Sequence, residues 1–207
     1  MGQAFPRSRR FWAVVVAFAV GALPTLTLNG MLVLGRGPWA TPGADFAILL
    51  GVVAIPVLVV ALPFLGARRT RRGATTVVLT SFVLVCATGL GLSGGHRLRI
   101  LALDHAARRA EPLVEAITRF EKDNARPPRT LQELMPHYLE RIPQGLPPLE
   151  LVSGDAVEQQ YPGNSWALHA SVGMGALDFD ELIYLPRQDY EGQGAVVRLG
   201  GWAYVRD

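Results

Sequence analysis

Long apolar runs alternate with short charged segments through the first 95 residues of the chain. Three of these runs approach the roughly 20 apolar residues that a helix needs to cross a bilayer. They cover residues 11–34, 46–66 and 75–93, and none contains a charged side chain. The pattern therefore predicts a membrane α-helical region with two or three transmembrane helices over residues 11–95, preceded by a basic N-terminus at residues 1–10.

Residues 96–207 have the composition of an ordinary soluble domain and begin with a helical pattern. Apolar residues recur there at spacings of three and four, at Ala106, Ala110, Leu113, Val114, Ile117 and Phe120. Pro112 lies inside this pattern, so the helix either starts there or bends there. We expect it to end by Ala125 or Arg126, because two prolines follow and disfavour helical geometry in the residue before each.

The remainder of this domain reads as one short helix followed by strands. Thr130 with Glu133 three residues later is a capping-box pattern, which predicts a helix over Leu131–Leu139. Beyond residue 143 the apolar period changes to two, as in a half-buried strand. Strands are predicted at Trp166–Val172, Leu182–Leu185, Ala195–Leu199 and Trp202–Val205. Residues 96–207 thus predict a small α+β domain, with an N-terminal helix packed on a short antiparallel sheet.

The arginine distribution predicts how the chain lies in a membrane. Through residue 95 the basic residues are all arginine and the single acid is Asp45. Arginines precede the first span and fill the loop at residues 67–72, and cytoplasmic loops are the ones that keep positive charge. We therefore expect a bacterial inner-membrane protein with a cytoplasmic N-terminus and a periplasmic or otherwise extracytoplasmic C-terminal domain.

The first span also fits a cleaved signal peptide. The N-terminal arginines would be its basic part, Phe11–Val20 its apolar core, and Val20-Gly21-Ala22 its cleavage site. Leu23–Leu34 stays largely apolar, where a mature polar segment would begin. Both interpretations leave residues 96–207 on the outer side.

Small residues form ridges on the predicted spans. They recur every four positions at Ala13, Ala17 and Gly21, and again at Ala87, Gly91 and Gly95. Such ridges let helix backbones approach closely, either against a partner protein or against another span of the same chain. Gly91 and Gly95 are accordingly candidate interaction residues. The absence of charged residues within the spans argues against a pump or a secondary transporter.

A helix end, a proline-marked turn and a short second helix follow one another within residues 105–143. The two runs are Ile117-Thr-Arg-Phe-Glu-Lys-Asp-Asn-Ala-Arg-Pro-Pro128 and Thr130-Leu-Gln-Glu-Leu-Met-Pro-His-Tyr-Leu-Glu-Arg-Ile-Pro143. This order resembles the soluble α+β domain of type II secretion pseudopilins, whose long helix leads through an Asn-Gly-x-Tyr-Pro turn to a short helix and a small sheet. A pseudopilin carries one apolar helix with Glu at its fifth mature position, which this chain lacks. The resemblance therefore implies the shape of the domain and not polymerisation.

Calcium is the cofactor that this resemblance implies, because major pseudopilins bind it in the loops of their sheet. The candidate ligands here are Asp178, Asp180 and Glu181. Their carboxylates are the hard oxygen ligands that calcium prefers. The segment lacks the spacing of a known calcium loop, so the alternative is an acidic turn solvated at the surface.

Aromatic residues supply a second candidate surface, since alternation places Trp202 and Tyr204 on one face of a strand. That face is a recognition surface if it is open, because Trp and Tyr dominate binding hot spots, and it is sheet core if it is covered. The four histidines show no metal-binding spacing such as HExxH.

Together these features favour a non-enzymatic integral membrane protein. We expect an accessory or structural subunit of an envelope or membrane complex, whose exported domain contacts another protein, with the lipid bilayer and a membrane or envelope protein as partners. Nucleic acid is not expected, because the excess basic charge flanks apolar runs and suits a membrane surface. The alternatives are a ligand-binding or calcium-binding sensory module and, third, an envelope hydrolase.

Overall fold

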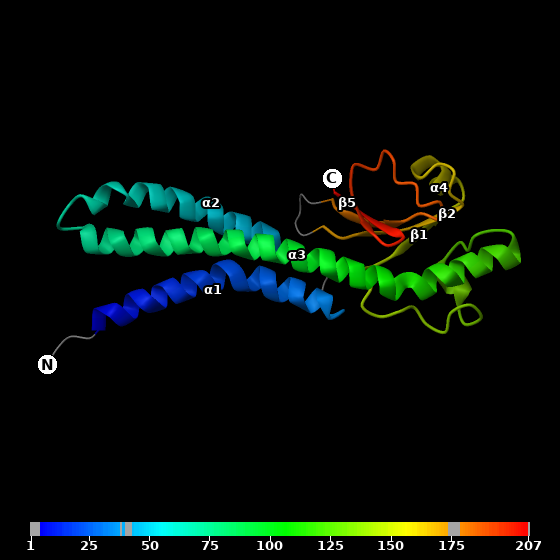
Figure 1. Cartoon of the computed structure of the whole chain (residues 1–207), viewed down its shortest axis with the longest axis horizontal. Helices are drawn as coiled ribbons and strands as arrows, with labels where there is room; N and C mark the ends of the chain where they lie inside the picture. The colour runs from blue at the N-terminus through cyan, green and yellow to red at the C-terminus, as the bar shows by residue number, and fades with distance from the viewer. Residues whose placement is uncertain (1–4, 38, 40–42, 174–178, 207) are drawn as a thin grey trace. The chain divides into compact units, whose positions relative to one another are not determined.

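The structure is a computed structural model, and it describes residues 5–37, 39, 43–173 and 179–206 (Figure 1). The chain divides into two compact units. One, here called the helical unit, comprises Met1–Gly30 and Pro42–Leu98. The other, here called the C-terminal unit, comprises Met31–Thr41 and Arg99–Asp207, so that it also takes in the connection after the first helix.

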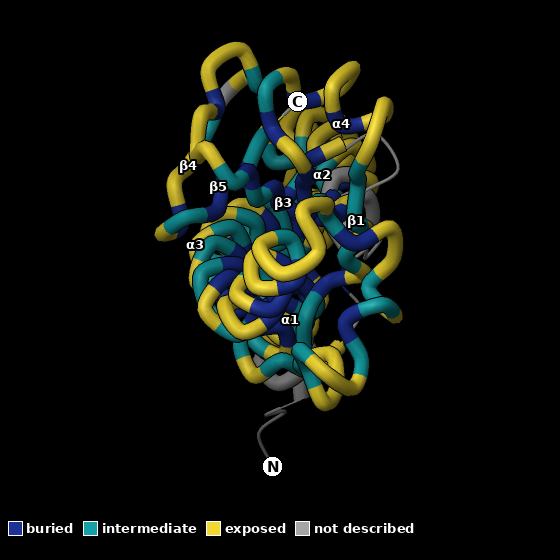
Figure 2. The backbone as a smooth tube through the Cα atoms, turned by 90° about the vertical axis from the view of Figure 1, so that its right-hand side faces the viewer, coloured by how far each residue is buried: buried dark blue, intermediate teal, exposed yellow. Residues whose placement is uncertain are grey.

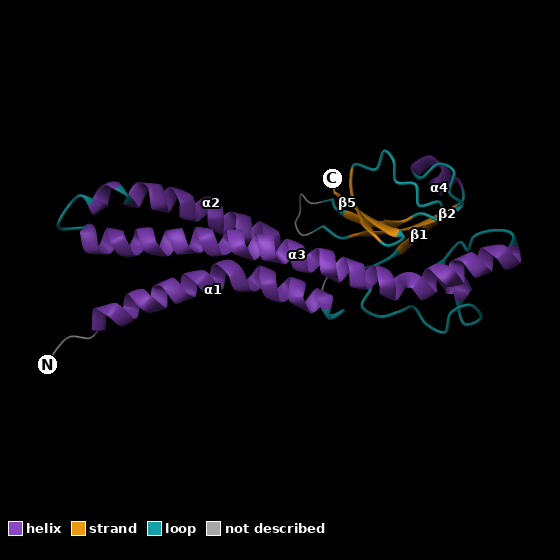
Figure 3. Ribbon diagram, in the orientation of Figure 1, coloured by secondary structure: helices purple, strands orange, loops and turns teal. Residues whose placement is uncertain are grey.

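The helical unit is built from apolar helices that expose large side chains. Its elements are α1 at Phe5–Val33, α2 at Gly43–Ala61, the 3₁₀ turn η1 at Pro63–Leu65, and the first part of α3, whose bounds are Arg71–Asn124 (Figure 3). Within the described residues, Arg10–Val33 and α3 are long and apolar enough to cross a membrane, and Leu49–Ala61 is a shorter apolar helix. Phe11, Val60 and Leu90 each expose more than 60% of their surface.

Small residues bring α1 and α3 into close contact within the helical unit. A Cβ added to Gly91 would lie 3.0 Å from Cα of Ala22, and one added to Gly95 would lie 2.6 Å from Cγ2 of Thr25. Ala87, on the same ridge, is fully buried. The ridge that contains Gly91 and Gly95 is therefore occupied by α1 of the same chain, which is the second of the two alternatives that the sequence left open.

In the C-terminal unit, α3 presents one apolar stripe to the core. Leu103, Ala106, Ala110, Leu113 and Ile117 are at most 1% exposed, as the spacing of three and four predicts. The helix does not start at Pro112, because α3 continues through this proline. It ends at Asn124, as predicted, and the next residue has the left-handed φ of 53° that commonly follows a helix end.

The predicted helix over Leu131–Leu139 is wrong in length. Only the 3₁₀ turn η2 at Leu131–Leu134 forms, and the Thr130 side chain makes no capping hydrogen bond. Glu133 instead accepts hydrogen bonds from the backbone N–H of Arg129 and from the Arg126 guanidinium, at 3.3 and 3.0 Å. The residue before Pro136 has the extended backbone that a following proline favours, and this ends the turn.

The sheet is five-stranded and antiparallel, in the order β1-β2-β3-β5-β4. Its strands are β1 at Glu150–Ser153, β2 at Trp166–Ser171, β3 at Glu181–Tyr184, β4 at Ala195–Leu199 and β5 at Trp202–Arg206. Four of these match the predicted strands to within one residue at either end. The fifth, β1, and the six-residue helix α4 at Asp155–Gln160 were not predicted.

Both faces of the sheet are covered, so β2 is buried on two sides rather than half-buried as predicted. Figure 2 colours the backbone of the chain by how far each residue is buried. One face packs on α3 and includes Trp166, Leu168, Leu182, Trp202 and Tyr204. The alternate positions of the same strands form a second cluster with α4 and the loops that follow α4 and β3, made by Val157, Tyr161, Ala167, Ile183, Tyr190 and Ala203. The small residues Ala167 and Ala203 gave this second face too little apolar signal for the sequence to reveal it.

Close contact at Gly91 predicts the effect of adding a side chain there. We expect Gly91→Leu to lower stability by about 1–3 kcal/mol, because the new side chain meets the α1 backbone rather than a mobile side chain. Gly89→Leu is the matched control on α3, since nothing lies within 4 Å of an added Cβ at that position. Thermal unfolding of the two purified variants in detergent compares them, and equal unfolding temperatures would contradict the close contact.

Candidate functional site

A cleft of about 550 Å³ lies in the C-terminal unit between α3 and the sheet. Its helix wall comes from Asp104, Ala107, Arg108, Glu111, Val114 and Glu115, and its sheet wall from Tyr184, Gln188, Leu199, Gly200, Gly201 and Trp202. We call it the α3–sheet cleft. The helical residues lie three and four apart and therefore share one face of α3.

Strand pairing brings the sheet wall of the cleft together. Tyr184 on β3 lies opposite Trp202 on β5, and Trp202 lies opposite Leu199 on β4. The Tyr184 ring stacks on Trp166 with centroids 5.5 Å apart and is tilted against Trp202 at 5.3 Å. Trp166, Tyr184 and Trp202 therefore form a continuous row of aromatic rings across β2, β3 and β5, and the last two rings line the cleft.

The two tryptophans of this row differ in their hydrogen bonding. The indole N–H of Trp166 donates to a carboxylate oxygen of Glu121 on α3, at 3.0 Å. Trp202 is 2% exposed, and its indole N–H has no acceptor among the residues that the structure describes. A buried donor without an acceptor costs about 1–3 kcal/mol, and this one belongs to a residue that lines the cleft.

Acidic side chains predominate among the charges on the helix wall. Arg108 pairs with Asp104 at 3.0 Å and is the single basic residue among the described residues of the lining. Glu115 lies 3.9 Å from Arg119, whereas Glu111 makes no ion pair with any residue in the described ranges. These groups are largely exposed, so each pair contributes little to stability, but the rim as a whole favours a basic ligand.

Tyr190 supports the turn at the sheet wall of the cleft. Its hydroxyl donates to the backbone oxygen of Gly201 at 2.7 Å and accepts from the N–H of Leu185 at 3.1 Å. The Arg198 guanidinium lies 4.1 Å from the centre of its ring. Burial raises the pKa of Tyr190 to about 12, because the charged phenolate is poorly solvated there.

Two other tyrosines are affected in the same direction. Burial, with a smaller contribution from the negative charge of Glu181, raises the pKa of Tyr161 to about 12. Burial also raises the pKa of Tyr184, against an opposing hydrogen bond with Gln188. All three hydroxyls therefore stay protonated, as donors, throughout the physiological pH range.

Trp202 and Tyr204 do share one face of β5, as alternation predicts, but that face is covered. They are 2% and 1% exposed and pack in the core cluster against α3. The hypothesis of an open aromatic recognition surface is therefore wrong for these rings in this structure. Tyr204 instead donates its hydroxyl hydrogen to the buried carboxylate of Asp180, and Trp202 contributes through the cleft that it lines.

The proposed calcium ligands are only partly visible. Asp178 lies outside the described residues. Asp180 is 6% exposed and accepts a hydrogen bond from the Tyr204 hydroxyl, and Glu181 is the first residue of β3. Among the described residues no three His, Cys, Asp or Glu side chains form a group that could hold a metal ion. The calcium site at these three residues thus stays a prediction.

The α3–sheet cleft was missed at the sequence level. Glu111 and Glu115, four apart on a helix, have the spacing of an ordinary solvated face, and Gly200-Gly201 has the composition of an ordinary turn between strands. Gln188 belongs to the loop after β3, and its backbone N–H donates to the backbone oxygen of Leu185 at 2.9 Å. The sheet wall of the cleft forms only when β3 pairs with β5, which brings Tyr184 beside Trp202. No local sequence pattern predicts that pairing.

Comparisons with protein-family models, with curated proteins and with solved structures found no match to this chain. Evidence for its function therefore comes from its own geometry.

The raised tyrosine pKa values predict loss of stability in alkali. Because the pKa values of Tyr161 and Tyr190 are about 12 when folded and near 10 when unfolded, their stabilising effect is complete below pH 10 and is lost as the pH rises towards 12. The unfolding temperature of the full chain, followed by tryptophan fluorescence, should fall across that window. A double variant, Tyr161→Phe with Tyr190→Phe, should fall less steeply, and an equally steep decline would contradict the assignment.

Loss of the Tyr190 hydroxyl has its own expected cost. We expect Tyr190→Phe to lower stability by about 1–3 kcal/mol at neutral pH, because the carbonyl of Gly201 and the N–H of Leu185 lose their partner. Chemical unfolding of the full chain in detergent measures the change. An unaltered unfolding midpoint would show that Tyr190 does not support the cleft wall.

Proposed function

We propose that the chain is a non-enzymatic integral membrane protein whose C-terminal unit binds a segment of a partner protein in the α3–sheet cleft. It acts as an accessory or structural subunit of an envelope or membrane complex. In this proposal the N-terminus is in the cytoplasm of a bacterial cell, the apolar helices lie in the inner membrane, and residues 96–207 form a pseudopilin-like periplasmic or otherwise extracytoplasmic domain.

The membrane part of the proposal is supported by helices whose length and surface suit lipid. Arg10–Val33 and the apolar part of α3 are long enough to cross a membrane. Many large apolar side chains of the helical unit are exposed, which water would penalise. The loop that contains Arg68, Arg69, Arg71 and Arg72 supports the orientation, because arginine-rich loops stay on the cytoplasmic side.

One observation carries the binding function: the α3–sheet cleft sets an aromatic wall, Tyr184 against Trp202, opposite acidic side chains of α3. The neighbouring Tyr184 ring offers apolar area, and Glu111 and Glu115 favour lysine or arginine in the bound segment. The expected ligand is therefore a basic stretch of protein.

A small organic ligand, bound by a sensory module, is the second candidate for the same cleft. It is favoured by the volume of about 550 Å³, which lies within the roughly 300–1,000 Å³ typical of small-molecule sites. The two candidates differ in the size of what can be covalently trapped in the cleft.

Site-specific photo-crosslinking distinguishes them. A photoreactive amino acid replaces Gln188 in the cleft or, as the control, Gln159, an exposed residue of α4, which packs on the opposite face of the sheet. We expect irradiation of cells to give a discrete protein adduct from position 188 and none from position 159. Absence of a protein adduct at position 188, or the same adduct at both positions, would contradict the proposal.

Charge reversal tests the acidic rim. We expect Glu111→Arg to reduce the yield of that adduct about fivefold or more, because it replaces an attraction for the basic segment with a repulsion. Glu158→Arg, an exposed position on α4, is the matched control and should leave the yield unchanged. Equal yields from both variants would exclude the acidic rim as the recognition element.

A further inference from the structure

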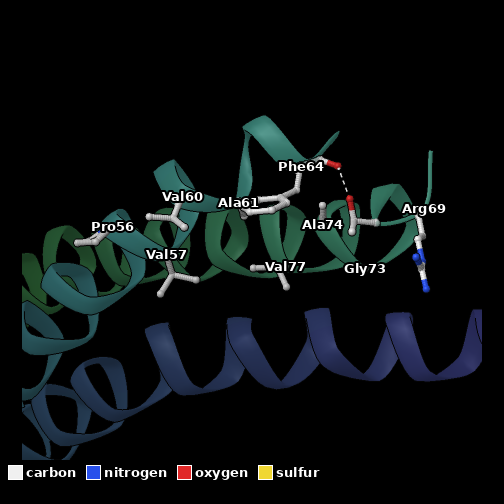
Figure 4. A pocket seen from close by; sticks show the side chains of 10 residues that line it. Pro56, Val57, Val60, Ala61, Phe64, Arg69, Gly73, Ala74 and Val77 are labelled. Carbon is white, nitrogen blue, oxygen red and sulfur yellow. Dashed lines mark hydrogen bonds between the residues drawn. The ribbon is translucent and has the colours of Figure 1, made fainter. Parts of the chain in front are cut away.

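A second hollow, of about 660 Å³, lies in the helical unit between α2 with its 3₁₀ turn and the start of α3 (Figure 4). Its walls are mostly apolar and include Val57, Val60, Phe64 and Val77. Gly73 forms part of the α3 wall, and nothing lies within 4 Å of a Cβ added to it. We call this hollow the α2–α3 groove.

The two ends of the groove differ in chemistry. Pro56 lies at one end and the Arg69 side chain at the other (Figure 4). The hydroxyl of Thr70 donates to the backbone oxygen of Phe64 at 3.1 Å, which links the turn beside Arg69 to the apolar wall. An apolar trough therefore ends at a guanidinium group.

Only positive charge surrounds this end in the sequence. Arg68, Arg71 and Arg72 flank Arg69, and all four are exposed. No acidic residue occurs between Asp45 and Asp104, so no carboxylate close in sequence competes for these arginines. A guanidinium group matches the oxygens of a phosphate with two parallel hydrogen bonds.

We propose that the α2–α3 groove binds an anionic phospholipid, with one acyl chain along the apolar walls and the phosphate at Arg69. The proposal rests on the membrane insertion argued above. Basic pockets between membrane helices on the cytoplasmic side bind acidic lipid headgroups, and the arginine loop is the one expected there. The apolar length of the groove selects a lipid over a free phosphate ion.

The test uses the full chain, purified in a neutral detergent and titrated with short-chain lipids. Native mass spectrometry counts the bound phosphatidylglycerol and, separately, phosphatidylcholine with the same acyl chains. We expect phosphatidylglycerol to bind about fivefold more tightly, the preference that one basic side chain near an anionic headgroup provides. Equal binding of the two lipids would overturn the proposal.

Two variants examine the two parts of the site separately. Arg69→Gln should abolish the preference for phosphatidylglycerol, whereas Arg68→Gln, in the same loop but outside the groove lining, should retain it.

Gly73→Leu should reduce binding of both lipids by filling the groove, and its gain in helix propensity favours folding. Gly89→Leu, which adds the same side chain at an exposed α3 position, should bind as the wild type does. Variants that behave like their controls would overturn the proposal.

Two further measurements separate the alternatives. Inorganic phosphate that displaced phosphatidylglycerol at comparable concentration would show a free-anion site and overturn the lipid assignment. Extraction of native membranes with alkaline carbonate tests insertion by itself. A chain that resists extraction yet shows no lipid preference would overturn only the groove, whereas an extracted chain would overturn the membrane function as well.

Discussion

The contact between the aromatic face of the sheet and the apolar stripe of α3 is the interaction on which the C-terminal unit depends. A five-stranded sheet with strands of four to six residues has little area of its own to bury. Leu113 and Ile117 of α3 and Leu168 and Leu182 of the sheet fill this contact, and all are almost completely buried. The hydrogen bond from Trp166 to Glu121 fixes the sheet on the helix at a defined point. The α3–sheet cleft exists because the contact lies beside a stretch of α3 where Glu111 and Glu115 replace apolar residues.

The sequence predicts the helices and strands that have a regular apolar period, but it does not predict which strands pair with one another. The end of α3 and the strands β2, β3, β4 and β5 follow from local rules: spacing of three and four, alternation, and prolines that stop a helix. The segments β1 and α4 carry too few apolar residues to produce such a signal. The second face of the sheet depends on Ala167 and Ala203, whose side chains are too small to mark a buried face in the sequence. The sequence left open whether the helix starts at Pro112 or bends there. It continues through the proline, because Leu103, Ala106 and Ala110, which precede it, belong to the same buried stripe.

The candidate sites follow the same division. Trp202 and Tyr204 could be placed on one face from the sequence, but whether that face was open depended on α3, a distant segment. The α3–sheet cleft needs Gly201, Tyr184 and Glu111 together, and these are brought together only by strand order and by the helix that covers the sheet. Asp180, considered first as a calcium ligand, is engaged in the core by Tyr204. The ridge at Gly91 differs from these sites, because its spacing is evident in the sequence. Only the helix that packs against it, α1, had to come from the structure.

The proposed function depends most on one proposal, that a membrane separates the arginine loop from residues 96–207. Cys86 is the only cysteine, so Cys86→Ala gives a background for single cysteines at Ala67, in the loop, and at Gln159, on the surface of α4. Labelling with a membrane-impermeant maleimide in spheroplasts tests the claim directly. The account predicts that Gln159→Cys reacts in intact spheroplasts and Ala67→Cys only after lysis. Reaction of Ala67→Cys in intact spheroplasts, or protection of Gln159→Cys until lysis, would contradict it.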